Sequence, residues 1–114
     1  MILYGLKACD TCRKARQELE KAGKTVEFVD VRETPLSGEL LSGFSASFGD
    51  TLVNRRSTTW RNLTESDRTG TPKSLIAAHP TLMKRPVIRD GDVLTLGWDA
   101  KTRAMHLGNS SAAS

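Results

Sequence analysis

Two cysteines separated by two residues, Cys9 and Cys12, are the only thiols in this 114-residue chain. Two thiols are too few for the disulfide framework of a small secreted domain, and too few for a four-ligand structural zinc site. The pair therefore indicates redox or nucleophilic chemistry. Because the thiolate is the reactive form of cysteine, the surroundings that lower a thiol pKa decide which of the two reacts.

The first cysteine is placed where a strand gives way to a helix. A short apolar run predicts a buried strand over residues 2–5, and the apolar spacing predicts a helix over Asp10–Ala22. The unpaired N–H groups at the start of a helix stabilise an anion, so Cys9 is the candidate nucleophile.

Charged residues surround Cys9 in the sequence. Lys7, Arg13 and Lys14 bring positive charge, which we expect to lower the pKa of the thiol, and Asp10 opposes them. The local sequence therefore predicts a reactive thiolate at Cys9.

Cys12 lies one helical turn further on and has two interpretations. It is placed to attack a mixed disulfide on Cys9 and so to resolve it. It also fits a small apolar side chain on the buried face of the helix, as free cysteines often are. The sequence leaves both interpretations open.

The elements that must position this pair extend along the chain. A second strand over residues 25–31 follows the helix, which predicts a right-handed parallel βαβ unit. Apolar residues at helical spacing predict a largely helical insertion from about 36 to 80. A hairpin over residues 86–96, with Asp90-Gly91 as its turn, and a short helix over 100–107 complete the pattern.

The order βαβ, helical insertion, ββα predicts an α/β protein with a thioredoxin-like fold and a mixed four-stranded sheet. We expect a single domain over residues 1–107. The small polar segment 108–114 is expected to be a flexible C-terminal tail.

Arginines supply candidates for anion binding. The segment Asn54–Arg61 contains three arginines, among them Arg56 and Arg61. Guanidinium groups recognise carboxylates and oxyanions, but surface arginines on a solvated helix end fit the pattern equally well. Arg85 precedes Pro86 at the expected start of the third strand, where a proline costs no ladder hydrogen bond. A cis and a trans peptide bond at this proline are both open.

Composition argues against several other classes of function. The formal charge is +4, but the six aromatic residues are not interleaved with a basic run, so we expect no direct binding of nucleic acid. No run approaches the ~20 apolar residues of a membrane span. Lys7 interrupts the first apolar run, so the N-terminus lacks the pattern of a signal peptide. We therefore expect a cytoplasmic protein, whose thiols are kept reduced. His79 and His106 have no second ligand at metal spacing, so we expect no metal site.

Five segments, in this order and spacing, resemble the ArsC/Spx/YffB family over about residues 1–106. The middle of the chain is most similar to the YffB-like branch. The segments are Leu3-Tyr4-Gly5, Cys9 to Ala15, Arg55 to Leu63, Lys84-Arg85-Pro86 and Leu96-Gly97-Trp98.

The resemblance implies a thioredoxin fold with a helical insertion and a cis Pro86. For the YffB-like branch it implies a glutathione-dependent thiol reductase in which Cys9 attacks as a thiolate. Arg13 and Arg85 would hold the thiolate and its anionic partner, with Arg56 and Arg61 as further clamp candidates. Pro86 would shape the substrate groove, and Cys12 or glutathione would resolve the intermediate. We expect no bound cofactor, glutathione as co-substrate, glutaredoxin as a possible partner and a monomeric protein.

Two alternatives come with the same resemblance. In arsenate reductases the cysteine that matches Cys9 attacks arsenate and several arginines hold the oxyanion. Arg85 matches one of those arginines, whereas Asn54 stands where another would be. In Spx-type regulators a disulfide between the residues that match Cys9 and Cys12 is a switch, and the protein binds the RNA polymerase α subunit.

Overall fold

The computed structural model describes residues 1–107, which fall into two compact units. Among the described residues, the first unit combines 1–30 with 85–107, and the second comprises Val31–Lys84. The helical insertion predicted at about 36–80 lies in the second unit. The predicted tail, 108–114, lies outside the described residues.

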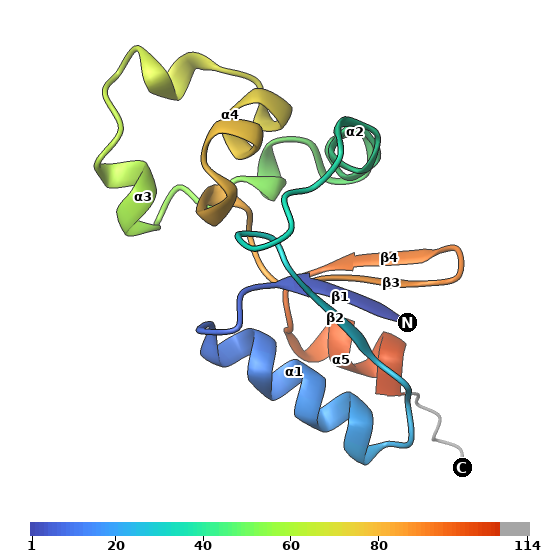
Figure 1. The fold of residues 1–114 in the computed structure, drawn as a ribbon. Helices are drawn as coiled ribbons and strands as arrows, with labels where there is room; N and C mark the ends of the chain where they lie inside the picture. The colour runs from blue at the N-terminus through green and yellow to red at the C-terminus, as the bar shows by residue number, and fades with distance from the viewer. Residues whose placement is uncertain (108–114) are drawn as a thin grey trace. The chain divides into compact units, whose positions relative to one another are not determined.

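The first unit is built on a four-stranded sheet in the order β2-β1-β3-β4 (Figure 1). The strands are β1 (Ile2–Gly5), β2 (Glu27–Asp30), β3 (Val87–Asp90) and β4 (Val93–Leu96). Strand β1 pairs parallel to β2 and antiparallel to β3, and β3 pairs antiparallel to β4. The predicted mixed sheet and parallel βαβ unit are therefore confirmed.

Two helices, α1 (Asp10–Lys21) and α5 (Ala100–Leu107), lie on the same face of this sheet (Figure 1). Their inner side chains pack with those of β1 and β3. The fully buried members of this core are Leu3, Cys12, Ala15, Leu19 and Ile88. Helix α1 ends at its C-cap Ala22, after which Gly23 adopts a positive φ of 88°, as the predicted helix end requires.

The structure corrects two details of the strands. The second strand is shorter than the predicted 25–31, because its pairing with β1 begins at Glu27. The hairpin turn is Gly91-Asp92 rather than Asp90-Gly91, since Asp90 pairs with Val93. Gly91 has a φ of 60°, and no non-glycine residue among those described has a positive φ, which fits a two-residue turn with glycine in first place.

The second unit consists of short helices. They are α2 (Gly38–Phe48), η1 (Gly49–Leu52), α3 (Thr58–Arg61), η2 (Asp67–Thr69), α4 (Pro72–Ala78) and η3 (Pro80–Leu82). The three α-helices begin at hydroxyl N-caps, because the side chains of Ser37, Ser57 and Thr71 each accept a hydrogen bond from a first-turn N–H. In the part of the chain described, no helix is both long and apolar enough to cross a membrane.

Candidate active site

Cys9 occupies the N-cap position of α1, directly after the loop that leaves β1. Its backbone is extended, its N–H donates to the carbonyl of Leu6 at 3.0 Å, and its own carbonyl accepts from the N–H of Arg13 at 3.0 Å. The side chain is half buried. The sequence prediction that the first cysteine stands at the start of the helix is confirmed.

The surroundings of Cys9 favour the thiolate over the thiol. Burial acts to raise its pKa, but the backbone N–H of Cys12, the thiol of Cys12 and the guanidinium of Arg85 more than offset burial, so the pKa is lowered. The Cys9 side chain makes no capping hydrogen bond to the first turn of α1. The hydrogen-bond donors that lower its pKa stabilise the thiolate, which is the nucleophilic form of cysteine.

Cys12 has the opposite environment. It is fully buried, and burial together with the neighbouring Cys9 raises its pKa to about 12. Gly5 makes this position possible: a Cβ on Gly5 would lie only 2.5 Å from the Cys12 sulfur and 3.2 Å from its Cβ. Cys12 is thus a protonated donor beside Cys9, packed against the end of β1.

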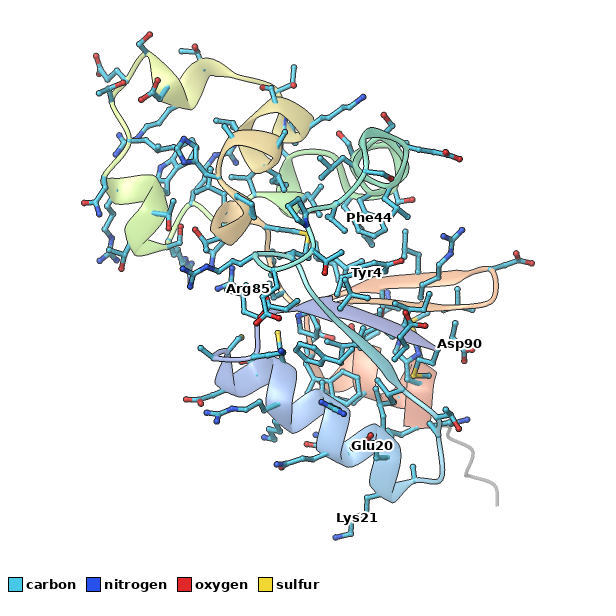
Figure 2. The ribbon with its side chains drawn as sticks, viewed as in Figure 1. Tyr4, Glu20, Lys21, Phe44, Arg85 and Asp90 are labelled. Atoms are coloured by element: carbon cyan, nitrogen blue, oxygen red, sulfur yellow. The ribbon has the colours of Figure 1, made fainter. Side chains whose placement is uncertain are left out.

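Arg85 comes from the other end of the sequence but belongs to the same unit. It lies just before β3, and Figure 2 shows it near the N-terminal turn of α1. Its guanidinium acts to lower the pKa of Cys9. The Arg85–Pro86 peptide bond is cis, which confirms the conformation that the resemblance implied. Pro86 itself is fully buried, so its role beside a substrate groove stays a prediction.

The cations next to Cys9 in sequence do not set its pKa as predicted. Arg13 pairs with Asp10 on the exposed side of α1, which balances one positive and one negative charge. Lys7 and Lys14 are exposed. The groups that lower the pKa are those of Cys12 and Arg85. Arg13 is therefore not positioned on the thiolate, because its guanidinium has a nearer carboxylate in its own helical turn.

A buried carboxylate fixes the loop ahead of Cys9. Asp30, at the end of β2, is 9% exposed, and its Oδ2 accepts the backbone N–H of Lys7 at 2.8 Å. Sequence reasoning missed this residue and Gly5. The signal for Asp30 was a carboxylate at the end of an apolar strand, and the signal for Gly5 was a glycine just before the C-x-x-C segment.

The other two candidate arginines, Arg56 and Arg61, belong to the second unit. Both side chains are exposed. Arg56 lines a hollow of about 520 Å³, together with Arg55, Lys84 and other residues of that unit. Arg61 does not line this hollow. Its backbone carbonyl accepts a hydrogen bond from the guanidinium of Arg68. The structure thus brings Cys9, Cys12, Arg85 and Pro86 together in one unit and places these two arginines in the other.

Within residues 1–107, no three His, Cys, Asp or Glu side chains are grouped so as to hold a metal ion. His106 is buried instead in the core of the first unit, where its Nε2 lies 2.6 Å from the hydroxyl of Thr95 and its ring stacks on Trp98. The site consists of a thiol whose pKa is lowered, a buried thiol and a guanidinium.

Comparison with known proteins places this arrangement in a family. The model of the ArsC family matches residues 4–104. The chain belongs to the ArsC family. The site described above therefore stands in an ArsC-family scaffold, on a thioredoxin-like mixed sheet.

Individual relatives within the family carry different names. The chain is similar to the solved structure of a YffB protein, with a TM-score of 0.85 and 33% identity over 93% of this chain and 97% of that one. It is also similar to an arsenate reductase-related protein from Brucella melitensis, with a TM-score of 0.72 and 32% identity over 94% and 93%. The global transcriptional regulator Spx of Streptococcus agalactiae is 28% identical over 81% of this chain and 72% of its own.

Proposed function

We propose that this ArsC-family protein is a thiol–disulfide oxidoreductase in which Cys9 is the nucleophile and glutathione is the co-substrate. The observation that carries the proposal is the pair of opposite pKa shifts: the pKa of Cys9 is lowered by Cys12 and Arg85 against the effect of burial, whereas the pKa of Cys12 is raised to about 12. One thiol is prepared to attack, and its neighbour stays protonated.

In the first step the Cys9 thiolate attacks one sulfur of a disulfide substrate. A mixed disulfide forms on Cys9, and the other sulfur leaves as a thiolate that takes a proton from solvent. The Cys12 N–H and thiol and the Arg85 guanidinium stabilise Cys9 both before attack and when it leaves again as a thiolate.

In the second step a thiolate must attack the mixed disulfide and release Cys9. Cys12 is a weak candidate because it is fully buried and its thiol holds its proton. A glutathione thiolate from solution can attack the mixed disulfide without the need to expose and deprotonate a buried thiol. A second glutathione then reduces any glutathionylated product, and oxidised glutathione is formed. This favours glutathione over Cys12 as the resolving thiol. Such a reaction needs the reducing conditions of the cytoplasm, the location that the sequence predicts, and glutaredoxin is a further candidate reductant.

The test compares two matched substitutions, Cys9→Ser and Cys12→Ser, in the complete chain. Turnover of a small disulfide with glutathione should fall below about 1% of the wild-type rate in Cys9→Ser, since a serine hydroxyl is a poor nucleophile without a base. Cys12→Ser should keep most of the rate. Unchanged turnover in Cys9→Ser would sink the proposal.

A second candidate is a redox switch, favoured by the closeness of the two thiols, each of which shifts the pKa of the other, and by the likeness to Spx. It predicts a Cys9–Cys12 disulfide under mild oxidation, slow turnover, and binding to the C-terminal domain of the RNA polymerase α subunit that differs between the oxidised and reduced forms. Equal binding of both forms would remove this candidate. Arsenate is a further candidate substrate, supported by Arg85 beside Cys9, and is tested by replacing the disulfide with arsenate in the same assay.

A further inference from the structure

The loop between β1 and α1 is short, residues 6–8, and leads directly to Cys9. The carbonyl of Leu6 accepts the N–H of Cys9 at 3.0 Å. The backbone of Leu6 also acts to lower the pKa of Cys12, although burial outweighs it there. A single residue of this loop therefore lies against both cysteines, so the position of the loop bears on both thiols.

Asp30 holds this loop from the neighbouring strand. It is the last residue of β2, and it pairs in register with Gly5, the last residue of β1 (Figure 1). The carboxylate is buried, and its Oδ2 accepts the N–H of Lys7 at 2.8 Å. A hydrogen bond to a charged acceptor is stronger than one between neutral groups, and burial strengthens it further. The contact therefore restrains the loop at its middle residue.

The loop and the Cys9 sulfur are approached from two sides of β1. Strand β1 lies between β2, which ends at Asp30, and β3, which Arg85 precedes. The guanidinium of Arg85 acts on the Cys9 sulfur, whereas the carboxylate of Asp30 contacts the backbone of the loop. The structure thus gives Asp30 an indirect route to Cys9, through the backbone of residues 6–8.

We propose that Asp30 is a positioning residue, which holds the loop 6–8 so that the backbone of Leu6 lies against both cysteines. In this role the place of the acceptor oxygen matters, and the negative charge does not act on the sulfur directly. The effect of Asp30 on turnover rests on the proposed function, whereas its effect on the Cys9 thiol does not.

Two other roles of this carboxylate predict different results. If its negative charge acted on the Cys9 sulfur directly, it would raise the pKa of Cys9, and its removal would lower that pKa. If its hydrogen bond contributed only to the stability of the fold, its removal would leave the pKa of Cys9 in the folded protein unchanged. The direction of the change in the Cys9 pKa therefore distinguishes the three roles.

Three substitutions of Asp30 in the complete chain separate the acceptor from the charge. Asp30→Asn keeps an acceptor oxygen and removes the charge. Asp30→Glu keeps the charge and displaces the acceptor by one methylene group, and Asp30→Ala removes both. Urea titration first shows that each variant is folded. The pH profile of iodoacetamide modification, followed by mass spectrometry, then gives the pKa of Cys9.

We expect the pKa of Cys9 to rise by about 0.5–1 unit in Asp30→Ala and Asp30→Glu. A released loop no longer holds Cys9 beside the groups of Cys12 and Arg85 that lower its pKa. At a pH below both pKa values, modification should therefore slow about threefold to tenfold. Asp30→Asn should stay within about twofold of the wild-type rate. The matched control is Glu27→Ala, which removes an exposed carboxylate at the other end of β2 and should leave the profile unchanged.

Faster modification in Asp30→Asn and Asp30→Ala would overturn the proposal, because the charge would then act on the sulfur directly. Unchanged profiles in Asp30→Ala and Asp30→Glu would also overturn it and leave a purely structural carboxylate. An equal slowing in Glu27→Ala would have the same consequence. If Asp30→Ala does not fold, Asp30→Asn and Asp30→Glu decide by the same criteria.

Turnover of a small disulfide with glutathione is measured separately. Slower modification in Asp30→Glu, together with no turnover in the wild type, would leave the role of Asp30 and remove the proposed function. Turnover in the wild type with unchanged profiles in the Asp30 variants would do the reverse.

Discussion

Cys9 is the N-cap of α1 and Cys12 lies in the first turn of the same helix, yet the structure gives their thiols opposite properties. Burial acts to raise the pKa of both. At Cys9 the donors from Cys12 and Arg85 outweigh burial, whereas at Cys12 burial prevails and the pKa reaches about 12. The difference shows that closeness to a helix N-terminus does not by itself activate a cysteine. Whether the pKa of the thiol falls or rises depends on how many hydrogen-bond donors reach the sulfur and on how deeply the sulfur is buried.

The two thiols also depend on each other. Cys12 can remain a donor to Cys9 only while it is protonated, and it is protonated because it is buried under the end of β1. Gly5 allows that burial by leaving room for the Cys12 sulfur. The packing of one cysteine is thus part of the activation of the other.

The largest effect is expected from filling the space that Gly5 leaves. In Gly5→Ala the new Cβ would lie 2.5 Å from the Cys12 sulfur and 3.3 Å from a methyl carbon of Leu3, so the helix or the strand must shift. We expect a loss of about 1–3 kcal/mol in the free energy of unfolding, measured with urea, as overpacking of a core causes. The pKa of Cys9 should rise at the same time, because the Cys12 donor is displaced.

Gly43→Ala is the matched control for this substitution. Gly43 lies inside α2, and nothing approaches within 4 Å of the position its Cβ would take. The same change should here stabilise the protein by about 0.5–1 kcal/mol, since alanine favours a helix. If both glycine variants unfold at the same urea concentration, Gly5 is not a packing requirement of Cys12.

The next prediction compares Arg85, which acts on Cys9, with Arg13, which is only close to Cys9 in the sequence. Arg85→Gln removes a charge and a donor from the Cys9 sulfur, so the pKa of Cys9 should rise by about one unit. Alkylation at a pH below both pKa values should then slow about tenfold, because there the thiolate fraction falls tenfold for each unit by which the pKa rises. The measurement is the pH profile of iodoacetamide modification followed by mass spectrometry.

Arg13→Gln supplies the comparison, since Arg13 is nearer in sequence and its charge is matched by Asp10. Its profile should move by clearly less than that of Arg85→Gln. An equal shift in both variants would mean that Cys9 responds to net charge rather than to a directed donor.

Much of this arrangement was predictable because local signals agreed with the fold. The apolar run before Cys9, the helical spacing after it and Gly23 predicted β1 and α1 almost to the residue. The hairpin turn was predicted one residue early, because Asp90-Gly91-Asp92 contains two dipeptides that suit a turn and only the pairing with β4 distinguishes them.

The surroundings of the sulfur were less predictable, for a physical reason. Sequence neighbours suggested that Arg13 lowers the pKa of Cys9, but a helix points that side chain outward to Asp10. Arg85 reaches Cys9 only because β3 pairs beside β1. The close approach of Gly5 to Cys12 likewise depends on how α1 packs on the sheet, which no local pattern reports.

The smallest effect tests whether Cys12 lowers the pKa of Cys9 because its thiol donates a hydrogen bond. Cys12→Ala removes the thiol donor but keeps the backbone N–H, so the pKa of Cys9 should rise by about half a unit. Alkylation at a pH below both pKa values should therefore slow about threefold. Cys12→Ser restores a donor in nearly the same volume, and its pH profile should return toward that of the wild type. Measuring both variants separates the donor from the packing, because each removes the buried sulfur. Equal shifts in Cys12→Ala and Cys12→Ser would show that the sulfur contributes by filling the core, and the coupling between the two thiols would then lie in packing alone.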